Sequence, residues 1–353
     1  MKAVRTDAEL EAPGIDAGLR SRGLDLVTLP EGIAEEDLAR AVADAELLLM
    51  CYTPVTARVI AAAPRLRGIV KYGVGIDAID IPAAQAGGIP VVNVPEYAEA
   101  TVAEGAFALM IALAKRLPEL HGEMQRVGWL WPEARWLGRD LAGAVLGIVG
   151  CGRIGRRLAR MAQGFGMRVL AYDPRADATE MAALGIEKVA ALPTLLGQAD
   201  FVSLHATLSP ASRHLLGAAE LAALKPGAIL VNTARGALID EAALVEAVLA
   251  GRLGGLGLDV YSREPLARAG HMLSPLFGRP EVILLPHLTF FTREAMARLE
   301  ADTLARCDEI LAGGPVTVHS HDARLRAQTA GVVFPADTGR AGQASGIEAG
   351  DKL

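Results

Sequence analysis

Cysteine, aromatic residues and basic clusters are all scarce in this sequence, and each scarcity argues against a class of protein. Only Cys51, Cys151 and Cys307 occur among 353 residues, an odd number without the CxxC spacing of a zinc site. No histidine spacing suggests a metal either. Aromatic residues make up 4% of the chain, so a core must consist mainly of aliphatic side chains. The net charge is −6 and no dense run of lysine and arginine is present, which argues against nucleic acid as a partner.

Long hydrophobic runs are missing as well. No apolar stretch reaches the length of a membrane span before a glycine, a proline or a charge interrupts it. The first residues lack the apolar core of a signal peptide. We therefore expect a soluble, cytoplasmic protein with reduced thiols and no membrane partner.

Hydrophobic residues nevertheless make up 52% of the sequence, mostly in short runs that alternate with helical segments rich in alanine and leucine. This alternation predicts an α/β fold with parallel sheets, and runs without polar alternation are typical of strands covered on both faces. The candidate strands lie at 46–50, 68–73, 90–94, 144–150, 168–173, 199–205, 228–234, 256–260 and 282–287.

Two long helical segments frame the second series of strands. The first, 99–117, can join two α/β lobes, and the second, 292–314, can pack back on the first lobe. From residue 320 onward the sequence is polar, rich in glycine and alanine and weakly periodic. We expect most of 320–353 to be a flexible tail in which only the segment GVVF can dock.

The segment VLGIVGCGRIG has the pattern of a strand that ends in a phosphate-binding turn. Its three glycines follow G-x-G-x-x-G spacing, which gives a tight turn, close approach of the backbone to a pyrophosphate and a helix N-terminus. A glycine-rich turn without a ligand is the alternative. Asp173 ends the next apolar run, where an acidic side chain can bond the adenosine ribose of a dinucleotide. An acid at this position favours NAD over NADP. Arg175, just past it, is a mild argument for the 2′-phosphate of NADP. The expected cofactor contacts are Gly150, Gly152, Arg153, Ile154, Gly155 and Asp173.

Three later strands are each followed by a residue suited to hydride-transfer chemistry. Arg235 can hold a carboxylate and a ketone oxygen, His287 can exchange a proton with that oxygen, and Glu264 can hold the imidazole and favour its protonated form. Taken singly, each has an ordinary alternative: a solvated ion pair, a turn residue before proline or a strand cap. Together, at the carboxyl ends of successive strands, they support one another. His205 also follows a strand and can lie by the nicotinamide.

The sequence resembles the D-isomer-specific 2-hydroxyacid dehydrogenase family over nearly all of residues 40–315. The resemblance rests on several motifs in the right order: KYGVGIDAID (71–80), GIVGCGRIG (147–155), VNTARG (231–236), LDVYSREP (258–265) and PH (286–287). It implies an NAD-dependent oxidoreductase of 2-oxo or (R)-2-hydroxy acids. It also implies two doubly wound parallel-sheet domains, a Rossmann NAD domain and a flavodoxin-like substrate domain that is discontinuous.

The resemblance further implies domain boundaries and site residues. The substrate domain comprises 1–96 and 290–319, and the NAD domain comprises 97–289. Arg235, Glu264 and His287 fall on the family's catalytic positions, and the helix 99–117 falls at its homodimer interface. Backbone N–H groups for the substrate carboxylate fall at Gly73, Val74 and Gly75, and contacts to the nicotinamide end fall at Thr233, Ala234 and Asp259.

Departures from the family pattern bear on the substrate. Tyr52 stands where phosphoglycerate dehydrogenases tend to carry an arginine for the phosphate, which argues against phosphoglycerate as the substrate. We expect a glyoxylate- or hydroxypyruvate-like substrate, with Tyr52 among the residues that bind it. Phe290 and Phe291 follow the histidine; they either line the crevice or only pack the hinge. Trp129, Trp131 and Trp136 are expected to anchor a subunit interface rather than to reach a neighbouring site. The alternative function is an NAD(H)-sensing, corepressor-like protein with little turnover.

Overall fold

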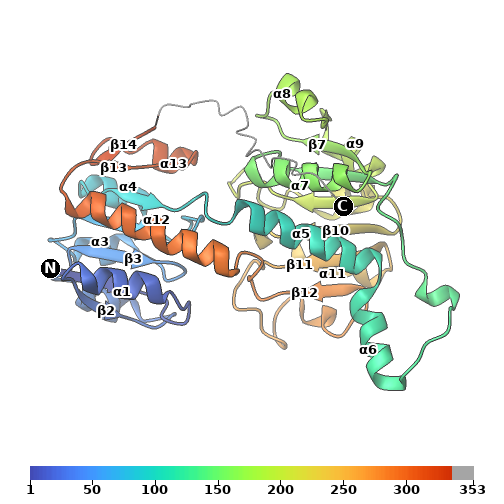
Figure 1. Ribbon diagram of the computed structural model, residues 1–353, viewed down its shortest axis with the longest axis horizontal. Helices are drawn as coiled ribbons and strands as arrows, with labels where there is room; N and C mark the ends of the chain where they lie inside the picture. The colour runs from blue at the N-terminus through green and yellow to red at the C-terminus, as the bar shows by residue number, and fades with distance from the viewer. Residues whose placement is uncertain (336–353) are drawn as a thin grey trace, which may run out of the picture. The chain divides into compact units, whose positions relative to one another are not determined.

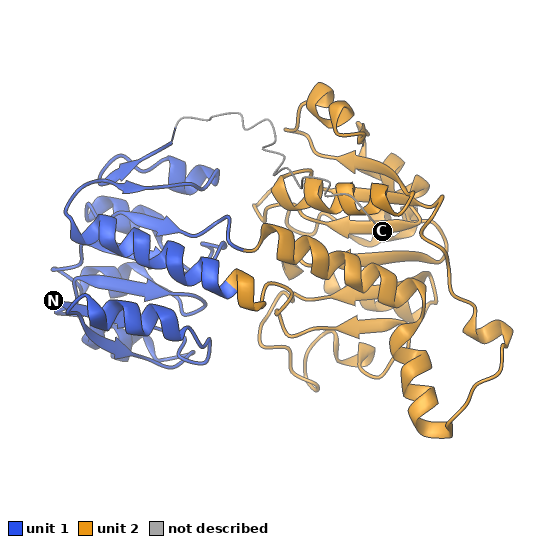
Figure 2. Cartoon of the chain, viewed as in Figure 1, with its two compact units in different colours: residues 1–97, 296–353 blue, residues 98–295 orange. Residues whose placement is uncertain are grey.

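The computed structural model describes residues 1–335, which fall into two compact units (Figure 2). Unit 1 contains Met1–Tyr97 and the chain from Met296 onward, and unit 2 contains Ala98–Ala295. The chain therefore leaves unit 1 after Tyr97 and re-enters it within one helix, α12 (Arg293–Leu311).

Unit 1 is built on a parallel five-stranded sheet of order β2-β1-β3-β4-β5. Its central strands are buried at almost every position, because helices cover both faces. The strands of this sheet are β1 (Lys2–Arg5), β2 (Asp25–Thr28), β3 (Leu47–Met50), β4 (Gly68–Lys71) and β5 (Val91–Asn93). The helices that accompany them are α1 (Pro13–Ser21), α2 (Glu35–Val42), α3 (Ala57–Ala61), α4 (Ile81–Ala86) and α12.

Helix α12 lies against unit 1 because small residues make room for it (Figure 1). A Cβ atom added at Gly18 would lie 2.4 Å from a methyl group of Leu304, and one added at Gly68 would lie 2.6 Å from Ile310. The backbone N–H of Gly14 also donates to Glu300 at 2.8 Å. The returning helix is thus fitted to the first lobe by close packing.

Unit 2 is built on a parallel seven-stranded sheet of order β12-β11-β10-β9-β6-β7-β8. Strand β6 has β7 on one side and β9 on the other, which makes its carboxyl end the topological switch point of the sheet. The strands are β6 (Val145–Val149), β7 (Arg168–Tyr172), β8 (Glu187–Lys188), β9 (Phe201–Leu204), β10 (Ala228–Asn232), β11 (Leu253–Leu258) and β12 (Val282–Leu284).

Helices cover both faces of this sheet. One face packs on α5 and α7, and the other on α9, α10 and α11. Helix α5 comes close to β11 because the strand presents glycines to it: a Cβ at Gly257 would lie 3.3 Å from Leu109. The helical segments are α5 (Glu99–Ala114), α6 (Leu117–Val127), η1 (Ala134–Trp136), α7 (Arg153–Gly164), α8 (Ala178–Ala183), α9 (Leu192–Gln198), α10 (Ala218–Ala223), η2 (Gly236–Leu238), α11 (Glu241–Leu249) and η3 (Ser274–Leu276).

The predicted α/β class with parallel sheets is confirmed, but two local expectations are corrected. The helix expected over 99–117 ends at Ala114, because Arg116 takes a left-handed conformation (φ 52°) and α6 begins afresh at Leu117. The flexible tail expected from residue 320 is wrong for its first part. Helix α13 (Ala323–Arg326) and strand β14 (Val332–Val333) form there, and β14 pairs with β13 (Val316–Thr317), which precedes the predicted tail.

The ordering of residues 320–335 has a clear cause. The side-chain amide of Gln328 is buried, accepts from the N–H of Val91 at 2.8 Å and donates to its C=O at 2.8 Å. These two bonds satisfy the open edge of β5, the last strand of the sheet. The rest of the predicted tail, 336–353, lies outside the described residues.

Candidate active site

The glycine loop of unit 2 connects β6 to α7 at the switch point. Gly150 has φ 93°, and a Cβ there would lie 2.6 Å from the backbone of His205 and Ala206 on the neighbouring strand end. A Cβ at Gly155 would lie 2.4 Å from the carbonyl oxygen of Gly150. These two glycines are therefore required by the fold itself.

Gly152 is different, because nothing inside the protein requires a glycine at this position. Its φ of −77° is ordinary, and apart from its neighbours in the chain no atom of the described residues lies within 4 Å of a Cβ built there. It is the N-cap of α7, and no side chain of the described part caps that helix. Open space before an uncapped helix N-terminus suits a pyrophosphate, so the loop fits a dinucleotide.

The neighbouring side chains support this loop. Asp173, which follows β7, accepts hydrogen bonds from the N–H groups of Cys151 and Arg175, both at 2.9 Å. The guanidinium of Arg153 pairs with Glu99 at 3.2 Å, and Ile154 packs into the core. Arg153 and Ile154 are therefore expected to meet a cofactor through their backbone N–H groups.

Two side chains at the ends of β9 and β10 lie next along the sheet edge. The Nε2 atom of His205 lies 2.9 Å from the hydroxyl of Ser203, and burial lowers the pKa of His205 to about 4, so this imidazole is neutral at pH 7. The hydroxyl of Thr233 is buried and has no hydrogen-bond partner in residues 1–335. An orphaned buried hydroxyl fits a polar group of a ligand. The N–H of Ala234 donates to Asn232 at 3.0 Å.

Arg235 follows β10, and its backbone is held against the loop after β11. A Cβ at Gly236 would lie 2.0 Å from the backbone of Tyr261, so only glycine allows the two loops to meet. The guanidinium of Arg235 donates to the carbonyl of Ala234 at 2.6 Å. Its charge contributes to lowering the pKa of Glu264, which places the two side chains in one electrostatic environment.

Glu264 and His287 form a direct pair, as predicted from the sequence pattern. The Nδ1 atom of His287 lies 2.8 Å from one carboxylate oxygen of Glu264, and the other oxygen accepts from the N–H of Tyr261 at 2.9 Å. Burial raises the pKa of Glu264, but the hydrogen bond and charge of His287, the N–H of Tyr261 and the charge of Arg235 together outweigh it, so the net pKa is lowered. The carboxylate is thus ionised at neutral pH and orients the imidazole.

Asp259 contacts the loop that carries His287. Its fully buried carboxylate accepts from the N–H groups of Leu288 at 2.9 Å and Thr289 at 3.0 Å. His287 itself has φ 59°, a conformation that these bonds help to hold. Asp259, for which the family resemblance implied a contact to the nicotinamide end, therefore braces the histidine loop.

The two phenylalanines after His287 have separate environments. Phe290 is buried and lies edge-on to the His287 ring, with 6.3 Å between centroids. Phe291 is exposed. Phe290 thus packs the loop, whereas Phe291 is available to an outside contact.

Residues 107–289 match the family described as D-isomer specific 2-hydroxyacid dehydrogenase, NAD binding domain. The chain belongs to this family. The family predicted from the motifs is therefore confirmed, and the glycine loop and the Arg235, Glu264 and His287 positions all lie within the matched NAD-binding domain.

Named relatives of this dehydrogenase family differ in their substrates. The chain is 39% identical to D-3-phosphoglycerate dehydrogenase of Mycobacterium tuberculosis over 284 residues, which cover 80% of this chain and 52% of that protein. It is 41% identical to glyoxylate reductase of Korarchaeum cryptofilum over 269 residues, or 74% of this chain and 80% of the relative. The crystal structure of D-lactate dehydrogenase from Aquifex aeolicus, complexed with NAD and lactic acid, matches with a TM-score of 0.79 at 28% identity, covering 88% and 96%. The chain spans about half the length of the phosphoglycerate dehydrogenases it matches.

Unit 1 carries the residues that the dehydrogenase resemblance assigns to the substrate. Gly73, Val74 and Gly75 follow β4, and Tyr52 follows the adjacent strand β3. The N–H of Tyr52 donates to the buried carboxylate of Asp7 at 3.0 Å. The N–H of Gly73 donates to the carbonyl of Lys71 at 2.9 Å, so the amide expected to meet the substrate is already engaged. Within this loop we therefore expect only the Val74 and Gly75 amides to bind a ligand.

Residues 1–335 contain no cluster of three or more histidine, cysteine, aspartate or glutamate side chains suited to a metal ion. No helix in the same range is both long and apolar enough to cross a membrane.

Proposed function

We propose that the chain is an NAD(H)-dependent oxidoreductase that interconverts a small 2-oxo acid and the corresponding (R)-2-hydroxy acid. The observation that carries the proposal is the Glu264–His287 pair, 2.8 Å apart, on the same sheet as Arg235 and the glycine loop. A nicotinamide site, a proton donor and a fixed guanidinium are the parts that ketone reduction needs.

The chain's residues divide the work of this reduction. NADH, when bound, supplies a hydride and is left as NAD⁺. C2 of the 2-oxo acid would receive the hydride and Nε2 of His287 would give a proton to its oxygen, which would leave an alcohol and a neutral imidazole. Because Nδ1 lies 2.8 Å from the carboxylate of Glu264, that carboxylate holds the imidazole in one orientation, with Nε2 on the opposite side of the ring. Arg235 holds the carboxylate and ketone oxygens of the substrate.

The proposed substrate is glyoxylate- or hydroxypyruvate-like. The Val74 and Gly75 amides would receive its carboxylate, and Tyr52 would contact its other end. Tyr52 offers a neutral hydroxyl where a phosphate would call for a guanidinium. The neighbouring cation, Lys71, is buried and donates to the carbonyl of Cys51 at 2.6 Å. These side chains favour a small uncharged substituent over a phosphorylated one.

The direct test is NADH oxidation with a panel of 2-oxo acids that includes glyoxylate, hydroxypyruvate, pyruvate and 3-phosphohydroxypyruvate. We expect turnover with the small acids and a much higher KM for the phosphorylated one. Tight NADH binding without turnover of any acid would instead support the NAD(H)-sensing alternative.

Asp173→Ala should weaken NADH binding about tenfold and shift the NADPH/NADH preference toward NADPH by a similar factor. The physical reason is that the carboxylate both bonds the adenosine ribose and repels a 2′-phosphate. Fluorescence titration with NADH and with NADPH measures both affinities and therefore their ratio. Glu187→Ala, an exposed acid on the neighbouring strand β8, is the control. An unchanged NADPH/NADH ratio would assign the preference to another residue.

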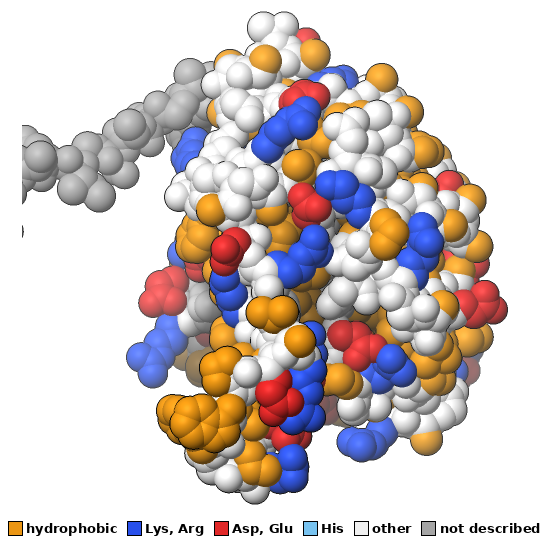
Figure 3. All heavy atoms as spheres, turned by 90° about the vertical axis from the view of Figure 1, so that its right-hand side faces the viewer, with side chains coloured by type: hydrophobic (Ala, Val, Ile, Leu, Met, Phe, Trp, Pro, Cys, Tyr) orange, Lys and Arg blue, Asp and Glu red, His pale blue; other side chains and the backbone are white. Residues whose placement is uncertain are grey.

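We further propose a homodimer formed through α6 and the segment after it. Helix α6 has no buried residue, and large apolar side chains on it and beyond it are exposed. Figure 3 faces the side of unit 2 on which α6 lies, where hydrophobic side chains alternate with charges of both signs. The exposed apolar side chains are Leu117, Met124, Val127, Trp129, Trp131 and Leu137.

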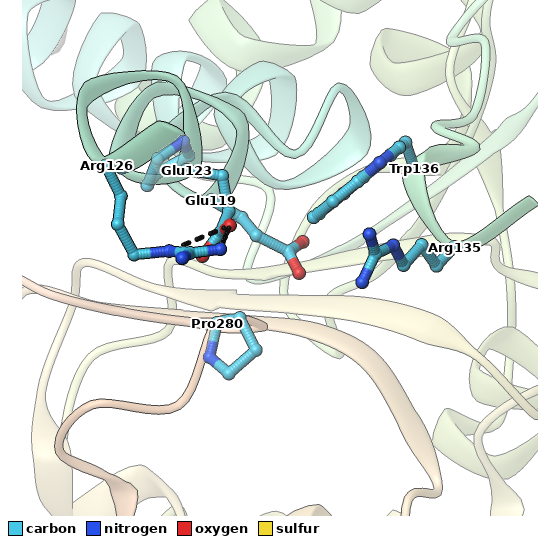
Figure 4. Close-up of a pocket in the computed structure, with 8 residues that line it drawn as sticks. Glu119, Glu123, Arg126, Arg135, Trp136 and Pro280 are labelled. Carbon is cyan, nitrogen blue, oxygen red and sulfur yellow. Dashed lines mark hydrogen bonds and ion pairs between the residues drawn. The ribbon is translucent and has the colours of Figure 1, made fainter. Parts of the chain in front are cut away.

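A groove of about 470 Å³ lies beside α6. Figure 4 shows Glu119, Glu123 and Arg126 of α6 on one side of it and Arg135 and Trp136 on the other. The indole N–H of Trp136 is buried without a partner among the described residues. Acids and bases in one groove suit a second copy of the same surface, because a two-fold interface pairs each charge with its opposite.

Light scattering after size exclusion tests this interface. We expect the wild type to be a dimer and the double variant Trp129→Ser, Trp131→Ser to be largely monomeric. Leu249→Ser, which removes another exposed apolar side chain, from α11, should leave the dimer intact. A dimer that persists in the tryptophan variant would place the interface elsewhere.

The cytoplasmic location also remains a proposal. It is supported by the three cysteines, which are free and buried.

A further inference from the structure

The loop Gly73–Gly75 is held to the end of β5 through its carbonyl groups. The N–H of Val94 donates to the carbonyl of Gly73 at 3.1 Å. The side-chain Nδ2 of Asn93 donates to the carbonyl of Val74 at 2.6 Å. Gly73 has φ 151°, a backbone conformation that favours glycine, and both carbonyls are bonded to this strand end.

Anchoring these carbonyls determines where the amides of the loop point. In a trans peptide the C=O and the following N–H lie in one plane and point in opposite directions. The Gly73 carbonyl shares its peptide with the N–H of Val74, and the Val74 carbonyl shares its peptide with the N–H of Gly75. The N–H groups of Val74 and Gly75 therefore point away from β5. No backbone acceptor in residues 1–335 takes either of them.

Asn93 uses only one end of its amide. The residue is 2% exposed, and its Oδ1 atom has no hydrogen-bond partner among the described residues. A buried acceptor without a partner destabilises the fold, so an apolar side chain of similar size would be the better choice for stability alone. What an apolar side chain cannot supply is the hydrogen bond to the Val74 carbonyl.

We propose that Asn93 is a positioning residue that orients the Gly75 amide toward the substrate carboxylate. This inference rests on the proposed function, since it assigns the loop to a 2-oxo acid. Asn93 contributes to substrate affinity without touching the substrate or the cofactor. The Oδ1 atom of Asn93 is left without a hydrogen-bond partner among the described residues when Nδ2 bonds the Val74 carbonyl.

Asn93→Leu separates this role from a structural one. Removing the anchor frees the Val74–Gly75 peptide to rotate, so we expect KM for the 2-oxo acid to rise at least about tenfold, while kcat changes by less than about threefold. The NADH Kd should stay within about twofold, because the glycine loop lies in unit 2. The thermal midpoint should stay the same or rise, since the unsatisfied acceptor is removed. Steady-state kinetics, NADH titration and thermal unfolding supply the readouts.

Val92→Ala is the matched control, because Val92 is the fully buried neighbour on the same strand. It should lower the thermal midpoint and leave KM unchanged, the opposite signature. Asn93→Asp, which keeps the shape but offers no donor, should raise KM as Asn93→Leu does, and it serves if the leucine variant does not fold.

A KM within twofold of wild type in both Asn93 variants would overturn the positioning role while leaving the proposed function intact. A wild-type protein that reduces no 2-oxo acid would overturn the proposed function and, with it, the inference.

Discussion

The His287→Ala protein is expected to lose kcat by roughly 10²–10⁴ while binding NADH as tightly as the wild type. The imidazole is the group that exchanges a proton with the substrate oxygen, and Glu264 holds it 2.8 Å away through Nδ1. Alanine leaves no acid at that position, but it leaves the glycine loop untouched. Stopped-flow or steady-state NADH oxidation and a separate NADH titration measure the two effects.

His121→Ala is the matched control for this substitution. His121 is an exposed histidine on α6, and its loss should leave kcat unchanged. Turnover of the His287→Ala protein at the wild-type rate would remove His287 from the mechanism and leave the Glu264 pair as a structural feature only.

Arg235→Lys carries the second large effect, although it conserves the charge. We expect kcat/KM for the 2-oxo acid to fall by roughly 10²–10³, because an ammonium cannot hold the carboxylate and ketone oxygens in one fixed fork. Gly236 allows the Arg235 loop to contact the Tyr261 backbone, so the backbone that carries the guanidinium is held in place. Kinetics over a substrate range measure both constants.

Arg263→Lys provides the comparison for Arg235. Arg263 is exposed in the neighbouring loop, so this variant should behave as wild type. If Arg235→Lys retained full kcat/KM, a single positive charge would be enough to bind the substrate. Two-point binding of the substrate by the guanidinium would then be excluded.

The main features of unit 2 could be predicted from the sequence because they depend on local patterns. The glycine loop is recognised by the spacing of its glycines directly after an apolar run. Glu264 and His287 each follow a predicted strand, and the carboxyl ends of parallel strands lie at the same edge of the sheet. The structure places Glu264 and His287 in contact, as that reasoning predicts.

Features that depend on contacts between distant segments were not predictable. The role of Asp259 rests on hydrogen bonds to amides thirty positions along the chain, and no spacing rule signals them. Gly236 stood in the family motif, yet only the structure shows the backbone of Tyr261 that excludes a side chain there. Gln328 lies in a stretch whose composition is typical of disorder. It is buried because its side-chain amide bonds the N–H and C=O groups of Val91 at the open edge of β5.

Short elements with charged residues escaped prediction for a different reason. Strand β1 has the sequence KAVR and β2 has DLVT, and neither shows an apolar run of useful length. Their pairing in register stabilises them, with Val4 opposite Val27. In β1, which is buried at three of its four residues, tertiary burial outweighs local propensity, whereas β2 has no buried residue and is held by its pairing with β1.

A crystal structure with NAD⁺ and a bound 2-hydroxy or 2-oxo acid would show directly whether Arg235 and His287 act on the same substrate oxygen. We expect the Arg235 guanidinium and Nε2 of His287 both to lie within about 2.7–3.2 Å of the oxygen on C2, with C2 against the nicotinamide ring. A substrate oxygen that meets neither group, or a nicotinamide bound at another edge of the sheet, would contradict it.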